Sequence, residues 1–169
     1  MAKRKLRKTN KTVLIVVEGE TEEAFIGHLK RLYYQRGTPL SVSIKNAHGH
    51  GPQGIINKLK SVAQTADFDH RFAVLDSDIA LLPAQEKWLR HQKVGLLFSN
   101  PAIEATLLSI LGKLAPALTH ACKGELHKQA PGDPTDGRYY DKYFPLAVLE
   151  QARKKVPVLE ALIAILRCE

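Results

Sequence analysis

The sequence predicts an α/β fold with a mainly parallel central sheet of about four strands, helices on both faces and further helices at the C-terminal end. Short apolar, β-branched runs alternate with segments of helical periodicity along residues 12–111. The strand-like runs are apolar at successive positions, as in strands buried on both faces of a parallel sheet. With 169 residues, 44% of them hydrophobic, we expect one domain, in which residues 112–169 form a loop and helical extension of the core.

Four strands and four helices are expected in the core. The strands cover residues 12–17, 40–44, 71–75 and 94–98, and the first of them, Thr-Val-Leu-Ile-Val-Val, is typical of a central strand. The helices cover residues 20–37, 53–65, 83–92 and 102–111. The first helix has acids in its first turn and bases toward its end, which complements the helix dipole.

The last third of the chain has a different character. Residues 124–137 are polar and contain Pro131, Gly132 and Pro134, so we expect a flexible loop there. Helical periodicity returns over residues 143–167, where Pro157 is expected to start or kink the last helix.

The positive charge of the chain is concentrated at its N-terminal end. The formal net charge is +8, and six basic residues among the first eleven account for most of it, leaving +2 for the rest. We expect residues 1–11 to form a flexible basic tail, which either binds nucleic-acid phosphates or is only a solvated end. In the first case the nucleic-acid-binding residues are Lys3, Arg4, Lys5, Arg7 and Lys8.

Other features argue for a cytoplasmic protein. The longest apolar stretches are interrupted by charged residues or Pro well before about 18 residues, and no apolar segment typical of a secretion signal follows the basic start. Cys122 and Cys168 have neither a CxxC nor a metal-ligand spacing, so we expect both to be free thiols.

Four acids are expected at the carboxyl edge of the sheet, where open α/β sheets bind their ligands. Glu18 follows the first strand, Glu22 lies four residues later on the following helix, and Asp76 and Asp78 follow the third strand. Clustered carboxylates repel one another unless a cation neutralises them, and Mg²⁺ or Mn²⁺ prefers oxygen ligands together with substrate phosphate. The alternative, that acids only complement a helix dipole, is preferred for Glu20 and Glu23.

Three segments resemble a known family. Val-Glu-Gly-Glu-Thr-Glu at residues 17–22 and Val-Leu-Asp-Ser-Asp at residues 74–78 resemble the TOPRIM domain of topoisomerases, primases and OLD-type nucleases. Phe-Ser-Asn-Pro-Ala-Ile-Glu at residues 98–104 is similar to the S-N-P-x-x-E stretch of RloB-like small TOPRIM proteins. The resemblance covers about residues 12–111.

The resemblance implies a compact Rossmann-like domain and metal-dependent nuclease chemistry. It assigns Glu18 to metal or acid/base chemistry and Asp76 and Asp78 to metal binding, and Glu22 matches the extra acid of OLD-type members. A setting in prokaryotic defence, with a partner ATPase or larger complex, is implied in the same way. Ala80 stands where the fullest TOPRIM pattern has a third acid, and this departure argues against a topoisomerase.

Several further residues are secondary candidates. Glu104 either supplies another metal ligand or is a solvated or capping acid of its helix. Ser99 and Asn100 are expected to cap that helix, the alternative being a hydrogen bond to the site. His48 and His50 are expected to be polar loop residues, the alternative being metal binding. The bases that could stabilise phosphate charge are Lys93, Lys123, Lys128 and Arg138, and the tyrosines expected to be partly buried helix residues, or alternatively to stack on bases, are Tyr139, Tyr140 and Tyr143.

The leading functional hypothesis is phosphodiester hydrolysis in DNA or RNA with Mg²⁺ or Mn²⁺. A second hypothesis is a non-catalytic nucleic-acid-binding module that acts with a partner. A third is an aspartyl-phosphate phosphatase or phosphotransferase with Asp76 as the nucleophile. The sequence argues against the third, because its Asp-x-Asp motif follows the third strand and continues with Ile79 and Ala80.

Overall fold

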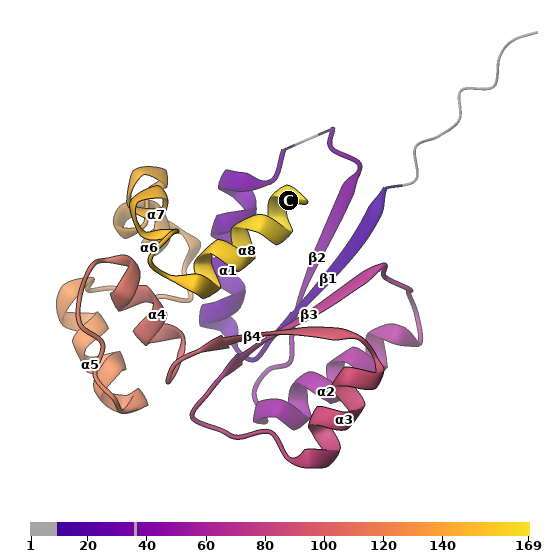
Figure 1. Cartoon of the computed structure of the whole chain (residues 1–169). Helices are drawn as coiled ribbons and strands as arrows, with labels where there is room; N and C mark the ends of the chain where they lie inside the picture. The colour runs from indigo at the N-terminus through magenta and orange to yellow at the C-terminus, as the bar shows by residue number, and fades with distance from the viewer. Residues whose placement is uncertain (1–9, 36) are drawn as a thin grey trace, which may run out of the picture.

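A four-stranded sheet with all strands parallel forms the centre of the computed structural model, which describes residues 10–35 and 37–169 (Figure 1). The strands are β1 (Lys11–Val17), β2 (Leu40–Asn46), β3 (His70–Asp76) and β4 (Val94–Ser99). Their order in the sheet is β2-β1-β3-β4, so the two strands followed by the predicted acids, β1 and β3, are neighbours. The predicted α/β fold with a mainly parallel sheet is confirmed.

Eight helices accompany the sheet in the described part of the chain. They are α1 (Glu20–Tyr33), α2 (Gly51–Ala63), α3 (Pro83–His91), α4 (Ile103–Ile110), α5 (Thr119–Gln129), α6 (Gly137–Tyr143), α7 (Leu146–Ala152) and α8 (Pro157–Arg167). Pro157 is at the first position of α8, as predicted, where its missing N–H costs no hydrogen bond. None of the described helices has the length and apolarity needed to cross a membrane.

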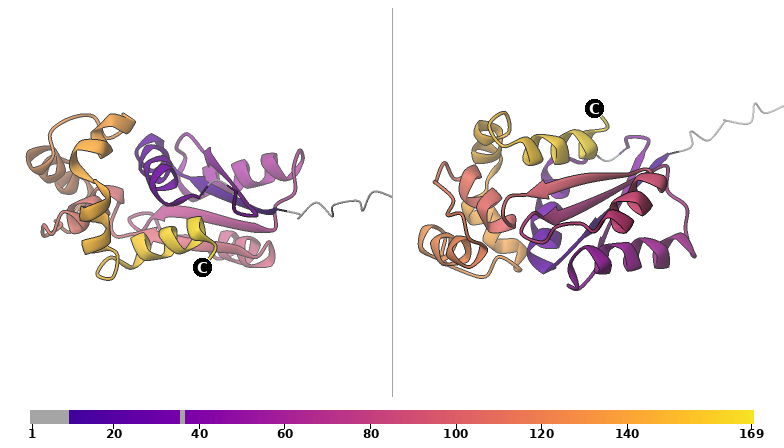
Figure 2. Two further views of the ribbon diagram at one scale, coloured as in Figure 1. Left: turned by 90° about the horizontal axis from the view of Figure 1, so that it is seen from above. Right: turned by 60° about the horizontal axis from the view of Figure 1, so that its bottom comes forward.

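Helices cover both faces of the sheet because the side chains of β1 alternate between two apolar cores. Val13, Ile15 and Val17 belong to the core shared with α1, α4 and α8, whereas Leu14 and Val16 belong to the core shared with α2 and α3. Figure 2 shows α8 on one side of the sheet and α2 and α3 on the other. The continuous apolar run of β1 is therefore explained by burial on both faces.

An aromatic cluster joins the C-terminal helices to α1. The ring of Phe25 in α1 lies 5.5 Å from that of Tyr140 and 6.2 Å from that of Phe144. Tyr139 packs edge-on against Tyr140 at 5.2 Å. Tyr139 and Tyr140 are buried, as expected of helix residues.

The prediction of a flexible loop over residues 124–137 is wrong for its first half, which belongs to α5. This helix has two buried apolar residues, Cys122 and Leu126, which lie one turn apart, so the sequence shows almost no helical periodicity. The packing of α5 against α4 therefore stabilises a helix that the hydrophobic pattern of the sequence does not indicate. Both cysteines are free thiols, Cys122 buried and Cys168 exposed.

Two details at the chain's N-terminal end bear on the expected tail. Residues 1–9, including Lys3, Arg4, Lys5, Arg7 and Lys8, lie outside the described residues. Lys11, which we assigned to the tail, is instead the first residue of β1, and its N–H donates to the carbonyl oxygen of Pro39 at 2.8 Å.

Candidate carboxylate site

Five acids line one cavity of about 310 Å³ at the carboxyl edge of the sheet, namely Glu18, Glu20, Glu22, Asp76 and Glu104, of which Glu20 is exposed. Glu18 follows β1 directly and Asp76 is the last residue of β3, so the pairing of these two strands brings both acids to the same place. Glu22 reaches the cavity from α1 and Glu104 from α4. We call this space the carboxylate cavity.

Glu22 is held in the cavity by the turn that connects β1 to α1. It lies in the first turn of α1 and is 5% exposed, although acids at helix N-termini are usually solvated. Gly19 caps the helix, and a Cβ atom at this position would lie 3.1 Å from Oε2 of Glu22. The glycine therefore leaves space for the carboxylate to turn back over the strand end.

Glu104, for which the sequence indicates a ligand and a capping role equally, lines the carboxylate cavity. It is 7% exposed in the first turn of α4. Its Oε1 atom lies 4.0 Å from Nζ of Lys123, which extends from α5 and also lines the cavity. A carboxylate that only capped the helix would be exposed to solvent, so the burial of Glu104 beside other acids favours the role of a ligand.

Asp78 is directed away from the carboxylate cavity. Its side chain is exposed, does not line the cavity and accepts a hydrogen bond of 2.7 Å from the hydroxyl of Thr119 at the start of α5. Burial is the main reason why the pKa values of Asp76 and Glu18 are raised, and the charge of Asp78 adds a smaller contribution to both. Nothing in the sequence pointed to Thr119, which lies 41 residues from Asp78.

The expected helix cap by Ser99 or Asn100 is wrong. The residue at the N-cap of α4 is Ala102, and no side chain bonds to this helix end. Asn100 instead accepts a hydrogen bond of 3.0 Å from the hydroxyl of Ser77, while Oγ of Ser99 is buried without a partner. Asn100 therefore contacts the segment between β3 and α3 through its side chain, and Ser99 does so only through its carbonyl oxygen, which accepts from the N–H of Ser77 at 2.9 Å.

The electrostatics of the cavity favour neutralisation. Burial, followed by the charges of Glu22 and the other acids, raises the pKa of Asp76 from 3.8 to about 8. Burial also raises the pKa of Glu18 and Glu22, partly offset by backbone hydrogen bonds. Oε2 of Glu18 and Oδ1 of Asp76 are buried and have no hydrogen-bond partner. Such a cluster is stable near neutral pH only if protons or cations reduce its charge.

The donor set fits a hard divalent cation that brings part of its own coordination shell. In the described part of the chain, no three His, Cys, Asp or Glu side chains are already arranged to hold a metal ion. Mg²⁺, however, is usually bound by one or two carboxylates and completed by water and substrate phosphate. The unpartnered oxygens of Glu18 and Asp76, from adjacent strands, match that requirement.

A second, more open cavity of about 600 Å³ adjoins the first at Glu18, which lines both. Its other walls come from the start of α2, where His50 and Gly51 have positive φ angles of 67° and 54°, and from Ile79 and Leu82, which are 50% and 62% exposed. Glu18 thus stands between two spaces along the same edge.

Among the four bases considered as phosphate partners, Lys123 is the one that lines the carboxylate cavity. Lys93 directly precedes β4 and is therefore at the opposite edge of the sheet. Lys128 pairs with Glu125 at 3.7 Å, and Arg138 pairs with an acid two residues before it. The sequence could not separate these four, because their surroundings are set by α5 and the loops.

The family comparison agrees with the segments noted in the sequence. The sequence model of the RloB-like proteins matches residues 13–158. The chain belongs to the RloB-like protein family. Neither the curated proteins nor the solved structures gave a match. All residues that line the carboxylate cavity of this RloB-like protein, from Glu18 to Thr135, lie inside the matched range.

Proposed function

We propose that this RloB-like protein is a nuclease that hydrolyses phosphodiesters of DNA or RNA with Mg²⁺ or Mn²⁺. The observation that supports this most directly is that Glu18 and Asp76, which line the same cavity, each have a buried carboxylate oxygen without a hydrogen-bond partner. The TOPRIM and OLD-type resemblance supports the same chemistry. A role in prokaryotic defence with a partner ATPase belongs to the proposal on that resemblance alone.

In this proposal Glu18 and Asp76 hold the cation directly, and Glu22 and Glu104, which line the same cavity, are further ligands or partners of the water bound to it. When bound, a divalent ion polarises the phosphodiester and makes an attacking water more acidic. Glu18 borders both cavities and its pKa is raised, so it is the carboxylate best placed to accept a proton from that water. Asp78 acts only through its charge, because Thr119 holds its carboxylate.

Lys123 supplies the complementary positive charge. It lies beside Glu104 and its side chain is 63% exposed, so it can turn to a phosphate that enters the carboxylate cavity. A flexible lysine suits this purpose because its ammonium can follow the charge as it develops. The single cation among the described residues that line this cavity would then set the position of the strand.

The aspartyl-phosphate alternative gains no support from the geometry. The second acid of the Asp-x-Asp motif, Asp78, accepts a hydrogen bond from Thr119 and does not line the cavity with Asp76. A non-catalytic nucleic-acid-binding module is the competing function, since the same basic and acidic side chains could bind a nucleic-acid strand without cutting it.

The deciding experiment compares cleavage of labelled single- and double-stranded DNA and RNA in Mg²⁺, Mn²⁺ or EDTA. Wild type is compared with Glu18→Gln and with Glu86→Gln, which removes the same charge from an exposed position on α3. We expect metal-dependent cleavage by wild type and Glu86→Gln, and a loss of at least about 100-fold in Glu18→Gln.

Calorimetric titration with Mn²⁺ separates the two functions further. Binding of the ion by wild type and its loss in Glu18→Gln would support the assigned ligands even if a partner is required for cutting. Nucleic-acid binding without cleavage in every metal, with equal behaviour of Glu18→Gln, would refute the nuclease and leave the binding module.

A further inference from the structure

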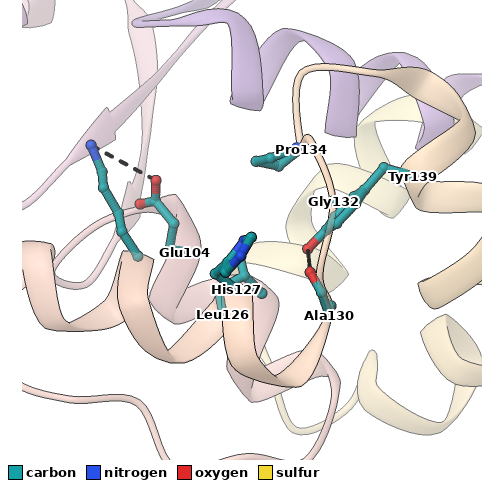
Figure 3. Close-up of a pocket in the computed structure, with 8 residues that line it drawn as sticks. Glu104, Leu126, His127, Ala130, Gly132, Pro134 and Tyr139 are labelled. Carbon is teal, nitrogen blue, oxygen red and sulfur yellow. Dashed lines mark hydrogen bonds and ion pairs between the residues drawn. The ribbon is translucent and has the colours of Figure 1, made fainter.

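A third cavity, of about 230 Å³, lies between α5 and the loop of residues 130–136, next to the carboxylate cavity (Figure 3). Glu104 and Lys123 line both spaces, so the two are neighbours across this ion pair. The remaining walls are mostly apolar. They come from Leu126, His127, Ala130, Gly132, Pro134 and Tyr139. We call this space the α5 cavity.

The α5 cavity is preformed because tyrosine hydroxyls fasten the loop that closes it. Tyr139 donates to the carbonyl oxygen of Ala130 at 3.0 Å, an interaction visible in Figure 3. Tyr143 donates to Pro131 at 2.8 Å, and Tyr140 donates to a carbonyl three residues farther along, also at 2.8 Å. Three carbonyl groups of the loop that was expected to be flexible thus accept hydrogen bonds from tyrosine hydroxyls. Preformed, largely apolar cavities with a few polar groups are typical ligand sites.

The walls combine flat apolar surfaces with a cationic entrance. His127 and the ring of Tyr139 line the cavity together with Pro134 (Figure 3). Lys123 lies beside Glu104 and also lines the carboxylate cavity. Gly132 has a φ angle of 141°, and a Cβ atom there would lie 3.1 Å from the ring of Tyr139. The absence of a side chain therefore allows the loop to pass close to this ring. The volume is below the roughly 300–1,000 Å³ of pockets for drug-sized ligands, which suits one planar ring system.

We propose that the α5 cavity binds one nucleobase of the substrate strand, next to the phosphodiester in the carboxylate cavity. Lys123 would contact the phosphate that links this nucleotide to its neighbour, and His127 would stack on the base, since every base offers an aromatic face to such a group. The inference rests on the proposed nuclease function and deepens it, because it predicts a substrate with an unpaired base beside the cleavage position.

The test measures binding of a short single-stranded oligonucleotide to Asp76→Asn protein, which removes one acid and prevents cleavage. An abasic nucleotide is placed at each position in turn. We expect one position at which loss of the base weakens binding by roughly 5- to 150-fold, the range of a single base stacking on an aromatic group. Added to Asp76→Asn, His127→Ala should abolish this position-specific penalty, because the partner of the base is then missing.

The contribution of Lys123 has a separate readout. Lys123→Ala should reduce the slope of log K against log salt concentration by about 0.7, the value for one phosphate contact in a single strand. Lys128→Ala is the matched control, since this lysine is on the same helix but does not line the cavity. It should change neither the slope nor the abasic penalty.

The outcomes distinguish the two proposals. If the oligonucleotide is bound and wild type cuts it, but no abasic position matters or the penalty survives His127→Ala, the nucleobase site is refuted and the nuclease stands. If no oligonucleotide is bound and none is cut under any metal, both proposals fail. Unfolding of each variant, followed by circular dichroism, excludes loss of structure as the cause.

Discussion

Replacing Asp76 by Asn should stabilise the cation-free protein at alkaline pH. Asp76 has a buried, unpartnered Oδ1 atom and a pKa raised from 3.8 to about 8, first by burial and then by the neighbouring carboxylates. Above pH 8 wild type must hold this group charged in the cavity, whereas Asn keeps the shape without the charge. A change inside the candidate site is therefore expected to increase stability, as is common where function requires an unfavourable arrangement.

The magnitude follows from the shift in pKa. Each pKa unit corresponds to about 1.36 kcal/mol, so the shift sets an upper limit of roughly 6 kcal/mol. Water enters the open cavity and screens the charge, so we expect about 1–3 kcal/mol. Because folding raises the pKa of Asp76, its favourable contribution is fully present below pH 3.8 and is lost as the pH rises through about 8. The gain of Asp76→Asn over wild type should be small near pH 5 and largest above pH 8.

Urea denaturation in EDTA at about pH 5 and pH 9 measures this difference, with Glu86→Gln as the exposed control. For a chain of this length, 1 kcal/mol corresponds to roughly 2–4 °C in Tm, so thermal unfolding is a second readout. Equal stability changes at both pH values would refute the argument, because they would show that the carboxylate is not held at an unfavourable charge.

Added Mn²⁺ should reverse the order of stability. A ligand that binds only the folded state stabilises it by about 2.7 kcal/mol at 100 times its Kd. Wild type should gain in this way and Asp76→Asn should gain less, since one carboxylate ligand is missing. A gain of the same size in both proteins would remove Asp76 from the proposed ligands.

Two further predictions concern parts of the fold that position the site. Gly54→Ala should destabilise the protein by roughly 1–3 kcal/mol in urea denaturation, because its Cβ would overlap with the carbonyl oxygen of Gly49, whereas Gly27→Ala, with open space around its Cβ, should be neutral or stabilising. Tyr140→Phe should cost roughly 1–3 kcal/mol, because the hydroxyl shares its one proton between two main-chain carbonyls, at 3.1 Å in α1 and at 2.8 Å in the loop before α6; an unchanged Tm would contradict this.

The sequence by itself determined the class of fold and the place of the site. Burial on both faces forces a continuous apolar run in a central strand, and such a run is visible without any structure, as in residues 12–17. Acids that directly follow these runs must come to the carboxyl edge, because all parallel strands end there. Glu18 and Asp76 could therefore be placed together from spacing alone.

Tertiary structure decided which of the remaining side chains face one another. Asp78 and Glu104 are both acids just beyond a strand, yet a hydroxyl from α5 holds the first outside the cavity and packing of α4 buries the second inside it. Helix α5 could not be predicted from the sequence, because only two of its residues are buried and they do not produce a clear helical periodicity. Its packing against α4 stabilises it instead. The position of α5 also brings Lys123 to the carboxylate cavity and forms one wall of the α5 cavity. Neither feature could be predicted, because contacts between segments distant in the chain leave no periodicity in the sequence.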